Sequence, residues 1–351
     1  MPSTDALTIV HVVFSSRLAG GERHCIDLAQ AQAALGHRVH LVGPISSALR
    51  GAVAASITYH GIAVPLARGL QLKSVARRVG ADVCHGHLGP ACKAVARVTA
   101  ATRIGTLHVG YKPHQHADLD GLICVNRAQS GLLADYRGEA QVIYNWAPLR
   151  EADDRGNLRA ELGLRPGQLL VGSLGRLNKA KGMDVLIEAF RASAPPDAVL
   201  AILGEGEELP ALRRLAGTDP RVRLLGFRSD VNAALQAMDL FVSPSREEAF
   251  PLAILEAMRA GLPLISTATQ GPLEMLAGQP AQIVPVDDAP ALGHAIAGML
   301  STLGQLPRES RPRPRYDVSA FDRSTAVDRV LDFYRQVMAR VRERRSRADG
   351  V

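Results

Sequence analysis

The chain is poor in aromatic residues and in cysteine. Phe, Trp and Tyr make up 4% of its 351 residues, which argues against a single-stranded nucleic-acid binder that stacks bases on aromatic rings. Its four cysteines all lie in the first half, and no two of them form a CxxC pair. We therefore expect buried, neutral thiols in a reducing compartment rather than disulfides or a cysteine-based metal site.

Long apolar runs are also missing. No stretch approaches the ~18 uninterrupted apolar residues of a membrane-spanning helix. No basic segment leading into such a run opens the chain, as a secretory signal would. We therefore expect a cytoplasmic protein. Its net charge of +7 suits polyanions, anionic membrane surfaces or phosphorylated small substrates, without choosing among them.

Short apolar runs alternate with segments of helical periodicity, and the length predicts about two domains. Strands are expected at 9–14, 39–42, 82–84, 103–107, 121–125 and 141–143, and helices at 22–35, 90–101 and 129–135. Turn-forming residues accumulate at 144–168, which marks a linker. The alternation then resumes, with strands at 169–174, 198–203, 222–225, 240–244 and 263–266, and helices at 183–191, 208–216, 231–237 and 252–260.

This alternation predicts an α/β fold with two doubly wound, Rossmann-like domains, parallel sheets and a central cleft. We expect the first domain at 1–150 and the second at 165–315. The Pro- and Arg-rich segment 301–316 is expected to be a loop. An amphipathic helix is expected from residue 322 to about 344, because its apolar residues recur at helical spacing.

The strongest chemical signal is the segment 244–258, where a predicted strand leads into a helix. Glu248 lies in the loop and Glu256 lies more than a turn inside the helix, where Pro251 suits the first position. Two carboxylates can accept hydrogen bonds from sugar and ribose hydroxyls, and exposed amides at the helix start favour phosphate. The plain alternative is a surface loop glutamate and a solvent-facing one.

This segment resembles the EX7E signature of the retaining GT-B glycosyltransferases of family 4. Further motifs in the same order are Gly20-Gly21-Glu22-Arg23, Gly36-His37, 82–87, 106–108, 142–145, 174–182 and 225–227. The resemblance spans about residues 9–275. It implies transfer of a sugar from a UDP- or GDP-linked donor to an acceptor hydroxyl with retained configuration. It also implies that no metal, cofactor or covalent enzyme intermediate is needed, and that the C-terminal helix, 320–345, packs back on the first domain.

Catalytic roles follow from the same resemblance. Arg176 and Lys181 would stabilise the leaving diphosphate, because positioned cations offset the charge that develops there; Lys179 competes for the lysine role. Glu248 would orient the transferred sugar and Glu256 would hold the ribose. His108 would face the reacting centre.

Other residues are expected at the donor site. Gly20 and Gly21 follow the first predicted strand and would let the backbone approach a phosphate. The missing third glycine of GxGxxG weakens a nicotinamide dehydrogenase interpretation. The remaining candidates are Gly204, Phe227, Ala249, Phe250, Pro251 and Leu252. Ala249 and Pro251 stand where the family often has glycine, and Pro251 removes one possible amide contact to the sugar.

A metal site is not expected. His85 and His87, like His114 and His116, are expected in separate loops without an acidic or cysteine partner at ligand spacing.

Rival interpretations are a sugar-nucleotide epimerase and a non-catalytic sugar-nucleotide-binding protein. The acceptor expected by analogy is a cell-surface glycan such as lipopolysaccharide, capsule or exopolysaccharide. The basic C-terminal segment, Arg340 to Arg347, is interpreted first as a solvent-exposed helix face. Its alternative is peripheral contact with the anionic cytoplasmic face of the inner membrane.

Overall fold

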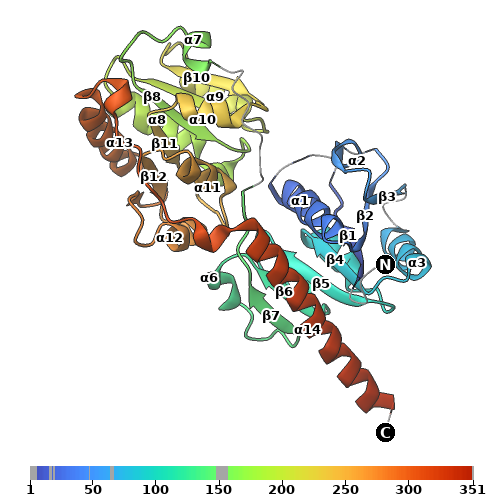
Figure 1. Cartoon of the computed structure of the whole chain (residues 1–351). Helices are drawn as coiled ribbons and strands as arrows, with labels where there is room; N and C mark the ends of the chain where they lie inside the picture. The colour runs from blue at the N-terminus through green and yellow to red at the C-terminus, as the bar shows by residue number, and fades with distance from the viewer. Residues whose placement is uncertain are drawn as a thin grey trace. The chain divides into compact units, whose positions relative to one another are not determined.

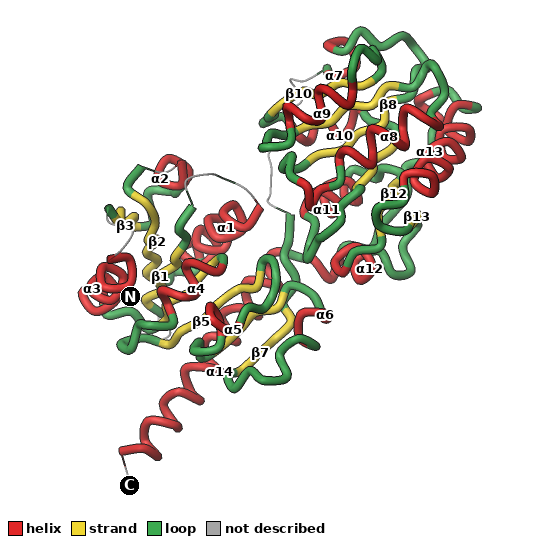
Figure 2. Tube along the Cα trace, turned by 180° about the vertical axis from the view of Figure 1, so that it is seen from behind, coloured by secondary structure: helices red, strands yellow, loops and turns green. Residues whose placement is uncertain are grey.

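The computed structural model describes residues 6–15, 18, 20–46, 48–63, 67–147 and 157–349. The chain divides into two compact units. Unit 1 comprises residues 1–148 and 321–351, and unit 2 comprises residues 149–320. Each unit contains its own sheet, drawn in yellow in Figure 2. Part of the predicted linker, 148–156, lies outside the described residues.

Unit 1 is built on a seven-stranded parallel sheet with the order β3-β2-β1-β4-β5-β6-β7 (Figure 1). The strands are β1 (Thr8–Val12), β2 (Arg38–Pro44), β3 (Thr58–Ile62), β4 (Val83–His87), β5 (Thr102–Leu107), β6 (Gly121–Cys124) and β7 (Glu139–Val142). The strand order reverses between β1 and β4, and such a switch point opens a crevice at the carboxyl ends of the strands.

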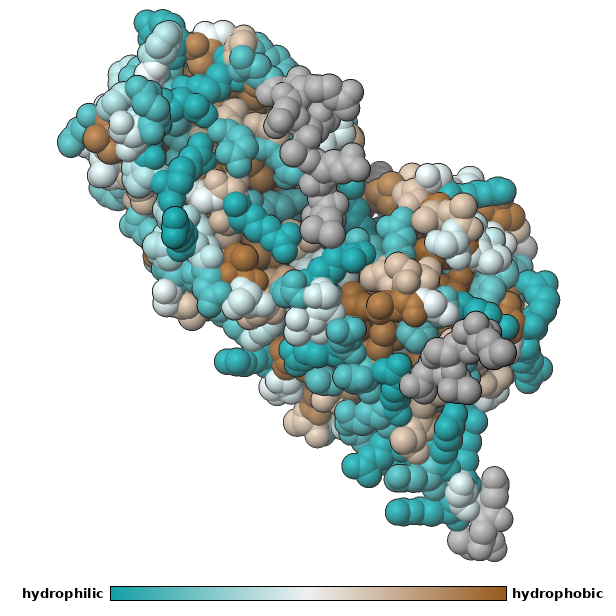
Figure 3. Space-filling view, in the orientation of Figure 1, coloured by the Kyte–Doolittle hydropathy of each residue, from teal (hydrophilic) through white to brown (hydrophobic). Residues whose placement is uncertain are grey.

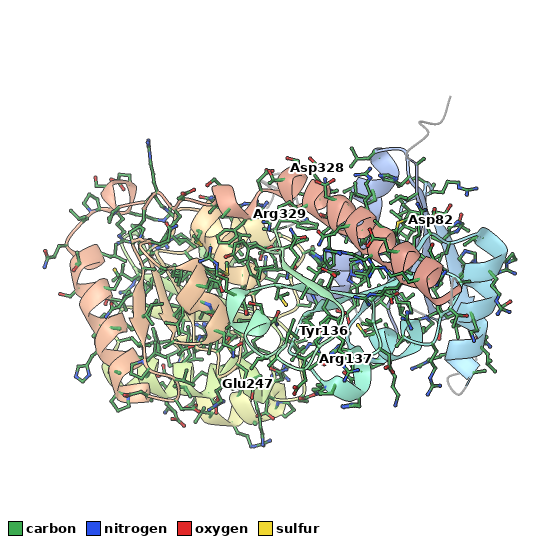
Figure 4. All side chains as sticks on the ribbon, turned by 90° about the horizontal axis from the view of Figure 1, so that it is seen from below. Asp82, Tyr136, Arg137, Glu247, Asp328 and Arg329 are labelled. Atoms are coloured by element: carbon green, nitrogen blue, oxygen red, sulfur yellow. The ribbon has the colours of Figure 1, made fainter. Side chains whose placement is uncertain are left out.

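Helices cover both faces of this sheet. They are α1 (Gly20–Ala34), α2 (Ala48–Ala52), α3 (Arg68–Val79), α4 (Gly89–Val95), α5 (Pro113–His116), α6 (Arg127–Ser130) and α14 (Arg323–Asp349). Because side chains alternate along a strand, Ile9 packs toward α1 and α14, whereas Val10 packs toward α3 and α4. Arg329, labelled in Figure 4, ties α14 to the end of β7 by donating to the Val142 carbonyl at 2.7 Å.

Unit 2 has a six-stranded parallel sheet with the order β10-β9-β8-β11-β12-β13. Its strands are β8 (Leu170–Leu174), β9 (Val199–Leu203), β10 (Val222–Gly226), β11 (Leu240–Ser243), β12 (Leu264–Thr267) and β13 (Gln282–Val284). Its α-helices are α7 (Leu158–Glu161), α8 (Met183–Ser193), α9 (Leu209–Ala216), α10 (Val231–Ala237), α11 (Leu252–Arg259), α12 (Gln270–Met275) and α13 (Ala289–Gly304). Among its described residues, the 3-10 turns are η2 (Lys179–Lys181) and η3 (Arg308–Ser310), and η4 (Ser319–Phe321) spans the boundary with unit 1.

Several predicted boundaries are wrong. The segment 301–316 is not all loop, since α13 continues to Gly304. The helix predicted at 129–135 is the single turn α6, because the side chain of Asn126 caps the Gln129 amide at 2.8 Å and starts the helix two residues earlier. The helix predicted at 90–101 ends at Val95. Among the described residues, no helix is both long enough and apolar enough to cross a bilayer.

Candidate functional site

The loops that follow β8 and β9 pack backbone against backbone at the carboxyl end of the unit 2 sheet. Gly204 has φ of +142°, and a Cβ there would lie 1.8 Å from the Gly175 carbonyl oxygen. The Leu177 amide donates to the Glu205 carbonyl at 2.9 Å. A side chain at position 204 would separate the two loops, so glycine is needed for this contact.

Arg246 joins the loop after β11 to the loop after β8. Its amide donates to the Ala180 carbonyl at 2.8 Å, and its guanidinium donates to Asp184 at 2.8 and 2.9 Å. Gly182 completes the junction, because it has φ of +61° and a Cβ there would lie 2.1 Å from the Pro244 carbonyl oxygen. Two loops from neighbouring strands are thereby held in one arrangement.

Lys181 and Glu248 meet at this junction. The Lys181 Nζ donates to Glu248 Oε2, and both side chains are largely shielded from solvent. Lys179 is exposed and supplies only its backbone carbonyl to Arg246, at 2.8 Å. Arg176 is also exposed, and its guanidinium pairs with none of the residues that the structure describes. The geometry therefore favours Lys181 over Lys179 as the lysine of this site.

The second glutamate lies inside α11. Glu256 is only 8% exposed, so the solvent-facing alternative is wrong for this residue. Pro251 precedes the helix as its N-cap and is not its first residue, which corrects the predicted position by one. Ala249 and Phe250 are buried in the connecting loop. The Gly271 amide at the start of α12 donates to the Glu248 carbonyl at 2.9 Å and fixes this loop from the other side.

Two buried oxygens near these loops lack a hydrogen-bond partner within the described part of the chain, Asn178 Oδ1 and Thr269 Oγ1. Asn178 belongs to the loop after β8, and Thr269 directly precedes α12. Buried polar atoms nearly always have partners. A polar ligand that reached these atoms would satisfy them. Phe227 follows β10 and is 60% exposed, which leaves its ring accessible to a ligand.

Unit 1 carries a second cluster, made of histidines. His108 directly follows β5, and its Nε2 lies 3.2 Å from His87 Nδ1. His87 Nε2 lies 3.0 Å from His11 Nδ1, and His11 Nε2 lies 2.7 Å from Gln32 Oε1. Burial lowers the pKa of His108 and of His11 to about 4 and holds the pKa of His87 well below its usual value. These three rings are therefore neutral near pH 7.

The predicted placement of the H-x-H pairs in loops is wrong. His85 and His87 are residues of the central strand β4, and His116 ends the short helix α5. Gly20 and Gly21 also differ from their predicted place, since they form the first turn of α1 instead of a loop directly after β1. A Cβ on Gly21 would lie 3.5 Å from His108 Cγ. The structure thus brings Gly21 and His108 together.

The expectation that no cysteine accompanies these histidines is also wrong. One ligand atom each from His11, Cys25 and His87 lies within 4.8 Å of the others. However, the two ring nitrogens of His11 and His87 are at hydrogen-bond distance. Burial raises the pKa of the Cys25 thiol, which opposes the thiolate that a metal requires. These residues fit a hydrogen-bonded network better than a metal site.

Cys25, Cys84, Cys92 and Cys124 are buried free thiols, and this part of the cysteine prediction is confirmed. Burial raises the pKa of Cys84 and of Cys92 to about 12. Trp146 is buried as well, and its indole N–H donates to Asp27.

Sequence reasoning missed His11, Gln32 and Tyr334, which belong to the histidine cluster. They come from β1, α1 and α14, so no local spacing could have joined them. A histidine inside an apolar strand, as at position 11, was the one available signal.

Comparison with known proteins covers most of both units. Residues 18–151 match the family model of Glycosyltransferase Family 4, and residues 168–302 match that of Glycosyl transferases group 1. The lipopolysaccharide core biosynthesis glycosyltransferase LpsE of Rhizobium meliloti is 29% identical over 273 residues, 75% of this chain and 78% of the relative. The lipopolysaccharide core biosynthesis mannosyltransferase LpsB of the same organism is 26% identical over 310 residues, 82% and 85% of the two chains.

A solved structure agrees in fold. The crystal structure of HepE from Anabaena in complex with UDP and glucose matches with a TM-score of 0.77 and 20% identity, covering 93% of this chain and 99% of HepE. At this identity the likeness concerns the fold alone, and it agrees with the two parallel sheets. Together with the family matches to both units, it shows that this chain belongs to the group 1, family 4 glycosyltransferases and has their GT-B fold.

Proposed function

We propose that this glycosyltransferase moves a sugar from a UDP- or GDP-linked donor to an acceptor hydroxyl, with retained configuration and without a metal or other cofactor. The observation that carries the proposal is the Lys181–Glu248 pair, together with Arg176 of the same loop, whose exposed guanidinium pairs with no described residue. Cations at the carboxyl end of a parallel sheet are well placed to bind a diphosphate. Unit 2 would therefore hold the donor, and unit 1 the acceptor.

The donor's diphosphate would compete with Glu248 for Lys181. A bound phosphate would draw the ammonium group to itself, and the Glu248 carboxylate would then be available to hydroxyls of the transferred sugar. Glu256 would accept hydrogen bonds from the ribose. Further donor contacts are assigned to Gly20, Gly21, Gly204, Phe227, Ala249, Phe250, Pro251 and Leu252.

The proposed sugar transfer depends on stabilising the negative charge that develops on the leaving diphosphate. As the bond between the anomeric carbon and the diphosphate oxygen breaks, negative charge grows on the leaving group, and Arg176 and Lys181 would stabilise it. The acceptor oxygen bonds to the anomeric carbon on the same face, and its proton passes to a phosphate oxygen. With two cations already supplying positive charge at this position, we expect a chelator to leave the rate unchanged.

The acceptor would be a cell-surface glycan, because the similar LpsE and LpsB are named for lipopolysaccharide core biosynthesis. We propose that the enzyme acts in the cytoplasm and that its basic end is a solvated face, with peripheral contact to the anionic inner membrane as the alternative. This rests on the exposed basic end of α14, which is hydrophilic in Figure 3. The residues concerned are Arg340, Arg342, Arg344, Arg345 and Arg347. Each such residue near the surface contributes about 1 kcal/mol.

The donor assignment is tested by thermal shift with UDP, GDP, ADP and their sugar conjugates. A ligand that binds only the folded protein raises its melting temperature. We expect one nucleotide family to do so, and Glu256→Ala to weaken the shift. Glu247→Ala is the matched control, because Glu247 is an exposed glutamate of the same segment (Figure 4). If none of these ligands stabilises the well-folded wild type, the proposal fails.

A further inference from the structure

A continuous line of hydrogen bonds crosses the interior of unit 1. It runs from His108 through His87 and His11 to Gln32, with N···N distances of 3.2 and 3.0 Å and a final N···O distance of 2.7 Å. Gln32 Nε2 then lies 3.5 Å from Tyr334 Oη on α14. Beyond it, the Tyr334 hydroxyl lies 2.6 Å from His85 Nδ1, and His85 Nε2 lies 2.7 Å from Thr106 Oγ1.

The amide of Gln32 gives this line a direction. Its nitrogen donates toward Tyr334, so its oxygen faces His11 and must accept a hydrogen bond from the N–H of His11 Nε2. A neutral imidazole carries one N–H, so His11 Nδ1 is an acceptor and accepts a hydrogen bond from the N–H of His87 Nε2. By the same rule, His87 Nδ1 accepts from the N–H of His108 Nε2.

We propose that Gln32, His11 and His87 are positioning residues that hold His108 in the Nε2–H tautomer and leave its Nδ1 as a bare hydrogen-bond acceptor for a substrate hydroxyl. The tautomer follows from unit 1 alone, whereas the substrate part rests on the proposed function. Among the described residues, His108 Nδ1 has no hydrogen-bond partner. The ring carbon beside it lies against Gly21, where a Cβ would approach to 3.5 Å.

This arrangement selects what His108 can bind. A bare ring nitrogen accepts a hydrogen bond from a hydroxyl, but it offers no proton to a phosphate oxygen and repels its lone pairs. The reversed tautomer, with Nδ1–H, would do the opposite. Burial lowers the pKa of His108 to about 4, so protonation does not override this choice near neutral pH. The ligand group at His108 is therefore a hydroxyl of the sugar or of the acceptor.

The competing occupant of the same place is a metal ion on His11, Cys25 and His87. A metal would use one ring nitrogen each of His11 and His87 as ligands, and all four ring nitrogens of these residues take part in the line of hydrogen bonds. It would therefore remove at least one of these hydrogen bonds and uncouple His108 from Gln32. The two possibilities therefore exclude each other.

The test is long-range ¹H–¹⁵N correlation NMR of the full-length protein labelled in its histidine side chains, with His108→Gln to assign the resonances. We expect a protonated Nε2 and an unprotonated Nδ1 for His108. Gln32→Met should convert this ring to a mixture of tautomers, because the anchor of the line is lost. His40→Gln is the matched control, since it removes one ring of the His40–His60 pair, 3.1 Å apart on β2 and β3, and should leave His108 unchanged.

A kinetic readout separates positioning from folding. In hydrolysis of the nucleotide-sugar selected by thermal shift, Gln32→Met should lower kcat/KM by roughly three- to tenfold, the worth of one hydrogen bond, without changing affinity for the free nucleotide.

Three results would each overturn the inference: a wild-type His108 protonated on Nδ1, a tautomer insensitive to Gln32→Met, or stoichiometric zinc in the purified protein. If Gln32→Met fails to fold, the His108 tautomer is tested by the NMR spectrum of the wild type and by that of Tyr334→Phe, which removes the hydroxyl that Gln32 contacts. Failure of nucleotide binding alone would reject the proposed function and leave the tautomer standing.

Discussion

Arg176 and Lys181 come from one loop but have different surroundings. Lys181 is tied to Glu248, whereas Arg176 is exposed and pairs with no described residue. Arg176→Ala should therefore leave the free energy of unfolding within about 0.5 kcal/mol of wild type. Its kcat/KM should fall by about 10²–10³, since a preorganised charge at the leaving group is lost. Steady-state kinetics and urea unfolding check both effects. Lys179→Ala is the control, and an equal loss of activity there would contradict the assignment.

The burial of His11 predicts that the stability of the protein depends on pH. Burial lowers its folded-state pKa to about 4, against an ordinary value of 6.5. The unfolded chain therefore binds more protons between these values, and the unfolding free energy falls as the pH drops from 6.5 toward 4. At pH 5 this one residue costs about 2 kcal/mol. Urea unfolding at a series of pH values from 7.5 to 5 gives the unfolding free energy as a function of pH. This free energy should fall less steeply with pH for His11→Gln than for wild type or for His294→Gln, which changes an exposed histidine. Equal slopes would contradict the account.

The sequence predicted the structural positions of Glu248 and Glu256 better than those of the histidines. Glu248 and Glu256 are eight positions apart in one strand–loop–helix segment, so local order is enough to place them. His108 was found by its position after a strand. Its partners His11 and Gln32 come from other elements, and only the folded sheet brings them together.

The loops after β8 and β9 depend on glycine at position 204. Gly204→Ala would force the Gly175 carbonyl, 1.8 Å from the new Cβ, to move. We expect the free energy of unfolding to fall by more than about 2 kcal/mol and the nucleotide-induced thermal shift to be lost. Gly298→Ala is the control, because a Cβ there meets nothing within 4 Å and alanine favours a helix interior. Wild-type stability and binding in Gly204→Ala would show that the loop contact is dispensable.

The helix α14 is a core element of unit 1. Phe333 is fully buried against the sheet, so Phe333→Ala should destabilise unit 1 by about 3–5 kcal/mol. Hydrogen exchange can follow the two units separately, and faster exchange is expected in β4 and β5 but not in β8 and β9. Arg335→Ala changes an exposed residue of the same helix and should have little effect. Uniform acceleration across both sheets would contradict the division into units.

Elements with a clear apolar period were predictable, and others were not. The strand β3 was missed because its sequence, Thr58 to Ile62, contains a histidine and a glycine and lies at a sheet edge. The helix α3 buries only Leu72, Val75 and Ala76 and carries a strongly basic surface, so its pattern is weak. The segment 244–258 was predicted closely, since an apolar strand and an apolar helix flank it.

The whole chain is not divided at one point, because residues 321–351 return to unit 1. Composition and length predicted two domains and the alternation of strands and helices predicted parallel sheets. The packing of the last helix on the first domain was predicted only from the family resemblance, because an amphipathic pattern does not show which surface the apolar face contacts. The apolar face of α14 covers Ile9, Val83 and Ile104, which lie far away in sequence.

The central claim is that unit 2 binds the nucleotide-sugar at the loops after β8 and β11. Hydrogen–deuterium exchange of the full-length protein, with and without the UDP- or GDP-sugar that raises the melting temperature, tests it most directly. The account predicts slower exchange in residues 175–182 and 244–256, with no change in β13 and α13. Protection confined to other segments, or none in these two loops at saturating ligand, would contradict it.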